Sequence, residues 1–256
     1  MLAPPPIGNE TKFSYNVSVY INKIIEIDEI DGYLQTKILF VRKWLNSQLT
    51  YQDLNRDPTK NLISSKDRKR MWGPWTVFDN IKHKNDVSPT DAPKIMMIIP
   101  HQAFLFEMDD KTNFRHTRLF RGDENIIQYQ KERVVKWVCD FDLRWYPFDV
   151  QNCTMNMYSS VSNVTIIPES VKYFGPQELI KHIVRGVSIR SANIDGKPGI
   201  TVEIIIGRPL FGTILTVFMP TLILLALSQI VRVFGQDHIE MVIEVNLTLL
   251  LVLATL

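Results

Sequence analysis

The chain has 256 residues, of which 45% are hydrophobic and 22% are charged. This length and composition allow a substantial hydrophobic core and exclude a largely disordered chain. The formal net charge is only +2, and no long run of Lys or Arg occurs, which argues against a nucleic-acid-binding protein. Neither the common enzyme motifs nor a cluster of Cys and His ligands is present, so we expect no enzyme activity, no metal site and no cofactor.

Alternating apolar and polar residues predict β-strands over most of the chain before Arg208. Near the N-terminus Val17, Val19 and Ile21 alternate with polar neighbours, and the same period of two recurs at 200–206. Further strand-like patterns occupy residues 36–44, 94–100, 116–120, 125–130, 133–142 and 150–159. The polar, aperiodic stretch 46–70 is expected to be a long connection with a helical turn. Short strands with polar joints predict an all-β, antiparallel sandwich of the immunoglobulin-like kind.

Both cysteines of the chain, Cys139 and Cys153, bound the short stretch CDFDLRWYPFDVQNC. One predicted strand runs into this stretch and another leaves it, so a disulfide would link two strands at the base of a hairpin loop. Closing a loop of about 15 residues would stabilise the fold by about 3 kcal/mol. The alternative is a pair of free, buried thiols in a cytosolic domain.

The tip of this loop is unusually apolar. Pro147 is expected to fix the turn, and Trp145, Tyr146 and Phe148 surround it. Three aromatic side chains are too many for a loop that meets only water, so we expect them to contact an apolar partner.

Glycosylation signals indicate an ectodomain that passes through the secretory pathway. Four Asn-X-Ser/Thr sequences precede the first long apolar run, at Asn9, Asn16, Asn152 and Asn163. A fifth, at Asn246, lies inside an apolar run and is interpreted as a chance match. A disulfide suits the same oxidising compartment.

Residues 209–231 contain no charged side chain. A helix of this length spans about 34 Å, enough to cross a bilayer core of about 30 Å, so we predict a membrane helix at 209–232. A second apolar run begins at 239 and is still apolar where the chain stops. We therefore expect a fragment of a longer protein, with an extracellular domain at 1–207 and a truncated, α-helical transmembrane domain at 208–256.

The second apolar run carries one polar stripe. Glu240, Glu244, Thr248, Leu251 and Thr255 are spaced so that they share a face of an α-helix. Charged residues within a bilayer are costly, so this face is expected to meet water or a partner rather than lipid. The alternative is that the two glutamates lie at the membrane boundary and only cap the helix N-terminus.

The cysteine-bounded stretch resembles the signature loop of the Cys-loop receptors, which are pentameric ligand-gated ion channels. Further similarities lie at Trp44, at Trp72-Gly73-Pro74, at Arg208-Pro209 and at Met219-Pro220. The chain is thereby identified as resembling a divergent, invertebrate-like subunit of this family.

This resemblance implies a homo- or heteropentamer in the plasma membrane, with the N-terminal domain extracellular. It leaves open whether the protein lies in the postsynaptic membrane. Its partners would be like subunits, the lipid bilayer, permeant inorganic ions and a small-molecule or ionic agonist that binds between subunits. Tyr146, Pro147, Phe148, Asp149 and Arg208 would couple agonist binding to the gate. The alternative is that these residues only close one end of the sandwich.

By the same resemblance, Leu251 would form the hydrophobic gate, and Thr248 and Thr255 would face the pore. Five copies of Glu240 and Glu244 would form acidic rings, which favour cations. Anion-selective members carry Pro-Ala-Arg where this chain has Glu-Met-Val, whereas similarity in the first membrane helix favours anion channels. We expect a cation channel. The alternative within the family is a chloride channel gated by protons, a metal or an amine.

Family agonist sites surround an amine with aromatic side chains. The matching positions here offer Tyr129, Tyr158, Asp79 and Ser160, and the loop 190–199 contains neither an aromatic residue nor adjacent cysteines. The sequence leaves the agonist open. A single-pass adhesion receptor with an immunoglobulin-like ectodomain is the alternative from another class, and the second apolar run argues against it.

Overall fold

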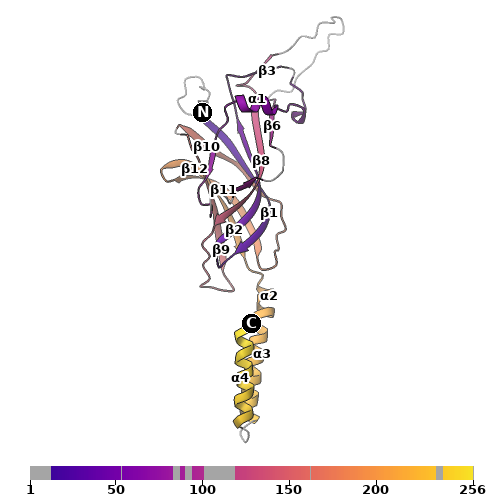
Figure 1. Cartoon of the computed structure of the whole chain (residues 1–256), viewed down its shortest axis with the longest axis vertical. Coiled ribbons are helices and arrows are strands. Elements are labelled where there is room, and N and C mark those ends of the chain that lie inside the picture. Colours follow the sequence, from indigo (N-terminus) through magenta and orange to yellow (C-terminus); the bar gives the residue numbers. More distant parts are fainter. Residues whose placement is uncertain are drawn as a thin grey trace. The chain divides into compact units, whose positions relative to one another are not determined.

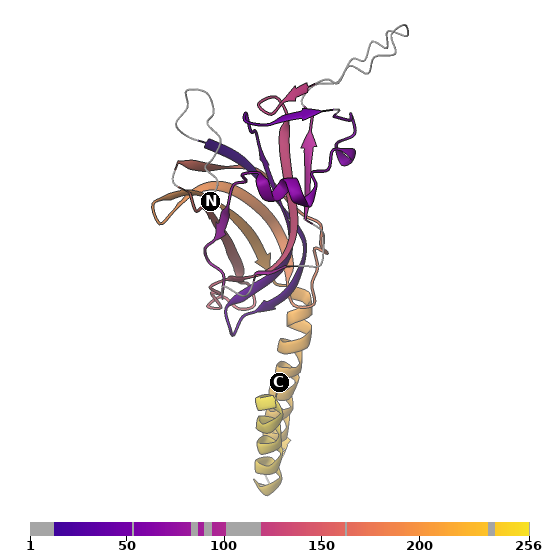
Figure 2. The ribbon, with the colours of Figure 1, turned by 45° about the horizontal axis from the view of Figure 1, so that its top comes forward.

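The structure, a computed structural model, describes residues 13–52, 54–82, 87–89, 94–100, 119–161, 163–234 and 239–255 (Figures 1 and 2). The chain packs as two compact units. Unit 1 takes its residues from Met1–Phe141, Asn152–Gln177 and Arg185–Ile205, and unit 2 from Asp142–Gln151, Glu178–Val184 and Ile206–Leu256. The strand-rich part is therefore unit 1, and unit 2 contains the C-terminal helices.

The larger sheet has six strands. They are β1 (Phe13–Asp28), β2 (Tyr33–Trp44), β5 (Val87–Pro89), β6 (Ile95–Ile99), β8 (Ile126–Val138) and β10 (Val164–Tyr173). Their order is β10-β1-β2-β8-β5, and β6 also pairs with β8. β1 and β10 run parallel, so the prediction of a purely antiparallel sandwich is wrong at this edge. These two strands are far apart in sequence, which leaves ample chain for the crossover that a parallel pair requires.

A second sheet has four strands. They are β4 (Thr76–Phe78), β9 (Val150–Ser159), β11 (Ile183–Ile194) and β12 (Lys197–Gly207), in the order β11-β12-β9-β4. A small two-stranded sheet joins β3 (Thr50–Gln52) to β7 (Leu119–Arg121). The predicted connection 46–70 contains β3, the 3-10 helix η1 (Pro58–Lys60) and the helix α1 (Ser65–Arg70). The helical turn expected there is confirmed.

Aromatic side chains join the two larger sheets. Phe78 of β4 packs edge-on against Phe40 of β2 and Trp137 of β8, with ring centroids 5.6 and 5.5 Å apart. Trp137 is fully buried, and its indole N–H donates a 2.9 Å hydrogen bond to Thr36. Such packing buries large apolar surfaces with favourable ring geometry. The prediction of an all-β sandwich is confirmed.

Several strands differ from the sequence-based prediction. The ranges 125–130 and 133–142 were expected to form two strands, but one continuous strand, β8, covers most of both. β10 and most of β11 lie where no strand was predicted. For the predicted strand 116–120, the part at 116–118 lies outside the described residues, and β7 accounts for the remainder.

The predicted loop 190–199 is mostly a β-hairpin. β11 and β12 are joined by Asp195 and Gly196, whose φ angles are +49° and +75°. Two consecutive residues with positive φ form the tight turn whose twist matches that of the flanking strands, and Asp-Gly is a favoured sequence for it.

The helical part of unit 2 consists of α2 (Leu210–Thr213), the π-helix η3 (Ile214–Phe218), α3 (Met219–Phe234) and α4 (Ile239–Thr255). Pro220 is the second residue of α3. Because proline cannot donate a backbone hydrogen bond and clashes with the preceding turn, the wider π-turns just before it relieve the helix. Among the described residues, no single helix combines the length and the apolar character needed to cross a membrane.

Candidate functional site

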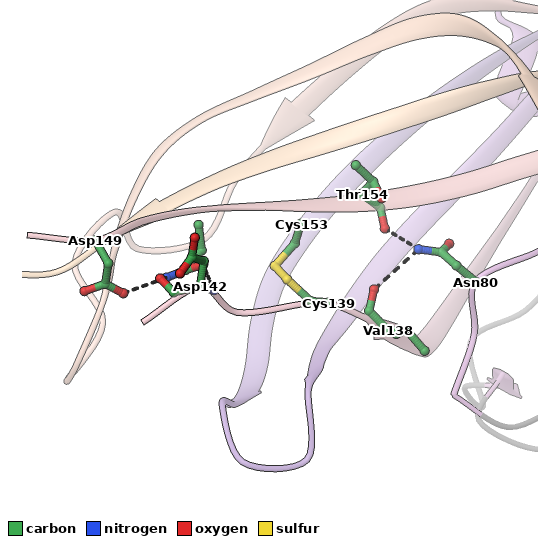
Figure 3. Close-up of a disulfide and its surroundings, with 8 residues drawn as sticks. Asn80, Val138, Cys139, Asp142, Asp149, Cys153 and Thr154 are labelled. Carbon is green, nitrogen blue, oxygen red and sulfur yellow. Dashed lines mark hydrogen bonds between the residues drawn. A yellow bond between two sulfur atoms is a disulfide. The ribbon is translucent and has the colours of Figure 1, made fainter. Parts of the chain in front are cut away.

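Cys139 and Cys153 form a disulfide, with their Cα atoms 5.1 Å apart (Figure 3). Both side chains are buried. The backbone N–H of Cys139 donates a 3.0 Å hydrogen bond to the carbonyl oxygen of Gly32, in the turn between β1 and β2. The predicted disulfide is therefore confirmed, and it closes the loop that connects β8 to β9.

Asn80, which no pattern in the sequence singles out, ties the same two strands together through its side-chain amide. Its Nδ2 donates to the carbonyl oxygens of Thr154, at 2.6 Å, and Val138, at 3.4 Å (Figure 3). Its Oδ1 accepts a 2.8 Å hydrogen bond from the backbone N–H of Asn156. Because these hydrogen bonds reach the backbone of both strands, the side chain supports the end of β8 and the start of β9.

A buried ion pair lies within unit 2. The Nε of Arg208 is 2.7 Å from Oδ1 of Asp149, and the two side chains are only 7% and 2% exposed. Gln151 donates a 2.6 Å hydrogen bond from Nε2 to the other carboxylate oxygen. The ring of Tyr146 covers the guanidinium, with Cζ of Arg208 4.7 Å from the ring centroid. Both oxygens of Asp149 are therefore occupied.

The environment of Asp149 favours its charged form. Burial by itself would raise the pKa of this carboxyl, but the hydrogen bonds from Arg208 and Gln151, together with the positive charge of Arg208, hold the pKa below its ordinary value. Gln151 also binds the backbone of Asp142. Its Oε1 accepts a 2.9 Å hydrogen bond from the Asp142 N–H, and its Nε2 donates one of 2.9 Å to the Asp142 carbonyl oxygen. One network thus fixes both ends of the loop tip.

The tip of the loop presents apolar rings to its surroundings. Trp145 is 76% exposed, Phe148 65% and Tyr146 44%, whereas Pro147 is buried. The peptide bond between Tyr146 and Pro147 is cis. Exposed aromatic side chains in one short loop are typical of a surface that meets an apolar partner.

The four predicted ligand-site residues fall into two groups. Asp79, Tyr158 and Ser160 lie along the β4–β9 pairing, where Val77 is the register partner of Tyr158. Tyr129 lies on β8, in the other sheet. The structure therefore brings three of the four residues together.

Both candidate tyrosine rings already face a cationic side chain of the same chain. Nζ of Lys197 lies 4.5 Å from the ring centroid of Tyr158, and Cζ of Arg42 lies 4.5 Å from that of Tyr129. These are cation–π distances. Each ring is therefore occupied in the way that an amine ligand would occupy it.

The predicted polar stripe lies on α4. Glu240, Glu244, Thr248 and Leu251 are exposed, and the side chain of Thr255 lies outside the described residues. The hydroxyl of Thr248 donates to the carbonyl oxygens of residues 244 and 245 of its own helix. A different residue links α4 to α3: the Ser228 hydroxyl is 2.5 Å from Oδ1 of Asn246.

Of the predicted glycosylation sites, Asn152 and Asn163 are exposed and Asn16 is half-buried within β1. Asn9 lies outside the described residues. In the part of the chain that the structure describes, no group of three or more His, Cys, Asp or Glu side chains could hold a metal ion.

Comparison with known proteins identifies the family. Residues 3–174 match the family model of the neurotransmitter-gated ion-channel ligand binding domain. Two relatives are the serotonin-gated chloride channel mod-1 of Caenorhabditis elegans, 23% identical over 146 residues, and the gamma-aminobutyric acid receptor subunit beta-4 of Gallus gallus, 26% identical over 143 residues.

Both relatives are receptors or channels and not enzymes. The matches cover 57% and 56% of this chain and 25% and 24% of the relatives. The chain thus matches about a quarter of each relative's length, whereas the family model covers more than half of the chain. The chain belongs to the neurotransmitter-gated ion-channel ligand-binding domain family, that of the Cys-loop receptors.

Proposed function

We propose that the chain is part of a subunit of a pentameric ligand-gated ion channel in the plasma membrane, with residues 1–207 extracellular and 208–256 in the membrane domain. Agonist binding between subunits would open a central pore lined by the helix that starts near 239. Family membership and the charge-free sequence 209–231 support this proposal. The observation that carries it is the buried Asp149–Arg208 ion pair.

The ion pair supports a coupling role for the loop. Arg208 directly precedes the helical segments, and Asp149 lies in the loop that the disulfide closes. Because both groups are buried and paired, separating them would leave a charge without a partner, at a cost of about 3 kcal/mol or more. The loop and the start of the helices would therefore move together, with Tyr146, Pro147 and Phe148 forming the contact surface.

For the pore, we propose that Glu240, Glu244, Thr248, Leu251 and Thr255 face the axis and that the acidic rings select cations. A chloride channel is the second candidate, because one relative is named a serotonin-gated chloride channel. For the agonist, the Lys197 side chain over the ring of Tyr158 supports a ligand other than a simple amine, since an amine would have to displace it.

The test uses a Leu251→Ser variant of the full-length subunit, expressed at a cell surface. A polar gate should hydrate and leak without agonist, so the reversal potential can be recorded while sodium or chloride is replaced by an impermeant ion. Leu250→Ser is the matched control, because this neighbouring leucine lines the small apolar pocket between α3 and α4.

A reversal potential that follows sodium supports the acidic rings as the selectivity filter. One that follows chloride replaces the cation channel with the second candidate. Equal leak in both variants, or none in either despite surface expression, would contradict the placement of Leu251 at the gate.

A further inference from the structure

A cavity of about 610 Å³ lies within unit 1, and strands of both large sheets line it. Four of its lining side chains are cationic, Arg42, Lys94, Lys131 and Arg133, and none of the lining residues that the structure describes is acidic. Within the described part of the chain, none of the four forms an ion pair with a carboxylate. Among the described residues, the cavity therefore concentrates positive charge without a counter-charge.

The strand β8 directs two of these cations inward. Along a strand, alternate side chains share a face, so Tyr129, Lys131 and Arg133 point to the same side as Val135 and Trp137. The last two are fully buried in the core. Packing alone would favour apolar residues at all five positions, so the polar ones are retained at a cost in stability.

The arginines are incompletely satisfied. Arg42 stacks over the ring of Tyr129 and donates from Nη1 to the carbonyl oxygen of Pro74. The Nε atoms of Arg42 and Arg133 are nevertheless buried and find no hydrogen-bond partner among the described residues. Buried donors of a charged group are normally paired, so two unpaired ones beside one cavity indicate a missing acceptor.

The positive charges around the cavity also repel one another. Burial lowers the pKa of Lys131, and the charges of Arg133, Lys94 and Arg42 lower it further. Burial likewise lowers the pKa of Arg42. An anion in the cavity would reverse this effect, since it would favour the charged form of every cation around it.

We propose that this cavity binds a small organic dianion, a dicarboxylate with an aromatic or other apolar body. The cavity has the volume of a small-molecule site and is larger than one inorganic ion would fill. The cations suit two carboxylates, and the rings of Trp75, Phe78 and Tyr129 suit the body between them. Because β4 belongs to one sheet and β2 and β8 to the other, the bound dianion would bridge the two sheets. The proposal goes beyond the channel function and does not depend on it.

The test measures thermal unfolding of the purified full chain with increasing terephthalate at constant ionic strength. Binding to the folded state alone should raise the midpoint in a saturable way, by about 5 °C at high occupancy. Terephthalamide, which has the same shape but no charge, should produce no shift, and sulfate should produce a much smaller one.

Lys131→Gln should abolish the shift with terephthalate and should also raise the midpoint without ligand, because it relieves the repulsion. Lys136→Gln is the matched control on the same strand. It makes the same charge change, but Lys136 contacts the ring of Tyr33 instead of the cavity. If Lys131→Gln does not fold, Arg133→Gln takes its place, and it should also abolish the shift with terephthalate.

The proposal is overturned if terephthalate produces no shift, if the diamide produces an equal one, or if the shift survives both cavity variants. A sulfate shift as large as that of terephthalate, lost in the same variants, would overturn the organic ligand and leave an inorganic anion site.

Discussion

At the scale of single residues, Asp149 combines burial, charge and a fixed partner. Its two carboxylate oxygens are held by Arg208 and Gln151. A buried ion pair contributes little in comparison with an apolar pair of the same shape, but removing one partner leaves the other charge buried and uncompensated. The geometry of the loop therefore depends on both charges being present.

We expect Asp149→Asn to lower the free energy of unfolding by about 3 kcal/mol at neutral pH, because the Arg208 guanidinium stays buried without a counter-charge. The pKa of Asp149 is lowered in the folded state, so the carboxylate's contribution is complete above the ordinary Asp pKa of about 4 and is lost as pH falls below it. Chemical unfolding of both proteins, followed by tryptophan fluorescence from neutral to acid pH, measures this difference.

Asp142→Asn provides the matched control. Asp142 also pairs with an arginine, Arg144, but that pair is exposed, so its loss should leave the unfolding free energy unchanged within error. If Asp149→Asn behaves like this control, or if its deficit persists unchanged at acid pH, the assigned role of the carboxylate is wrong.

At the scale of elements, the hairpin of β11 and β12 depends on its two-residue turn. Gly196 has a φ of +75°, which L side chains adopt only with strain, and an added Cβ would meet no atom within 4 Å. Any effect of a substitution there therefore comes from the backbone and not from a clash.

Gly196→Val should lower the free energy of unfolding by about 1–2 kcal/mol, since a β-branched residue is strained at positive φ. Thermal unfolding checks this prediction. Gly186→Ala, in β11, is the control, because Gly186 also has free space around its Cβ position but does not have a positive φ. That change should be neutral or slightly stabilising. An equal loss of unfolding free energy in both variants would mean that the packing of the strands, and not the turn, determines the stability of the hairpin.

The strands differ in how well the sequence predicts them. From Phe13 to Ile21 one face of β1 is buried, so its apolar residues alternate there, whereas register shifts beyond Ile21 break the period. β8 contains Lys131 and Arg133 on the face that an ordinary core would make apolar, and this interruption predicts two strands instead of one. β10 has few buried positions beyond its first residues, which leaves little periodic signal.

The site shows the same contrast. The disulfide follows from two nearby cysteines and the predicted strands around them. Asp149 and Arg208 are 59 positions apart in the sequence, and Asn80 and Thr154 are 74 positions apart. No local sequence pattern therefore predicts either contact. Resemblance to the family indicates the Asp149–Arg208 pair, whereas the hydrogen bonds of Asn80 can be recognised only in the folded structure.

At the scale of the whole molecule, surface exposure predicts which asparagines would carry glycans if the sandwich is extracellular, as proposed. Asn152 and Asn163 are exposed. Asn246 is instead hydrogen-bonded to Ser228 of the neighbouring helix.

In cells that secrete or display the protein, Asn152→Gln and Asn163→Gln should each remove one glycan, seen as faster migration on a gel and loss of one glycosidase-sensitive step. Asn246→Gln should leave migration unchanged. A mobility change in the last variant alone would contradict both the proposed extracellular position of the sandwich and the pairing of Asn246 with Ser228.

The division into units also affects how this chain could be recombined with its relatives. Unit 2 includes residues 142–151 and 178–184 as well as everything from 206 onward, so it is not a continuous piece of sequence. A chimera joined at 207/208 would keep Asp149 and Gln151 from one parent and take Arg208 from the other. Exchanging the three segments together would preserve the ion pair whatever residues the other parent carries at these positions.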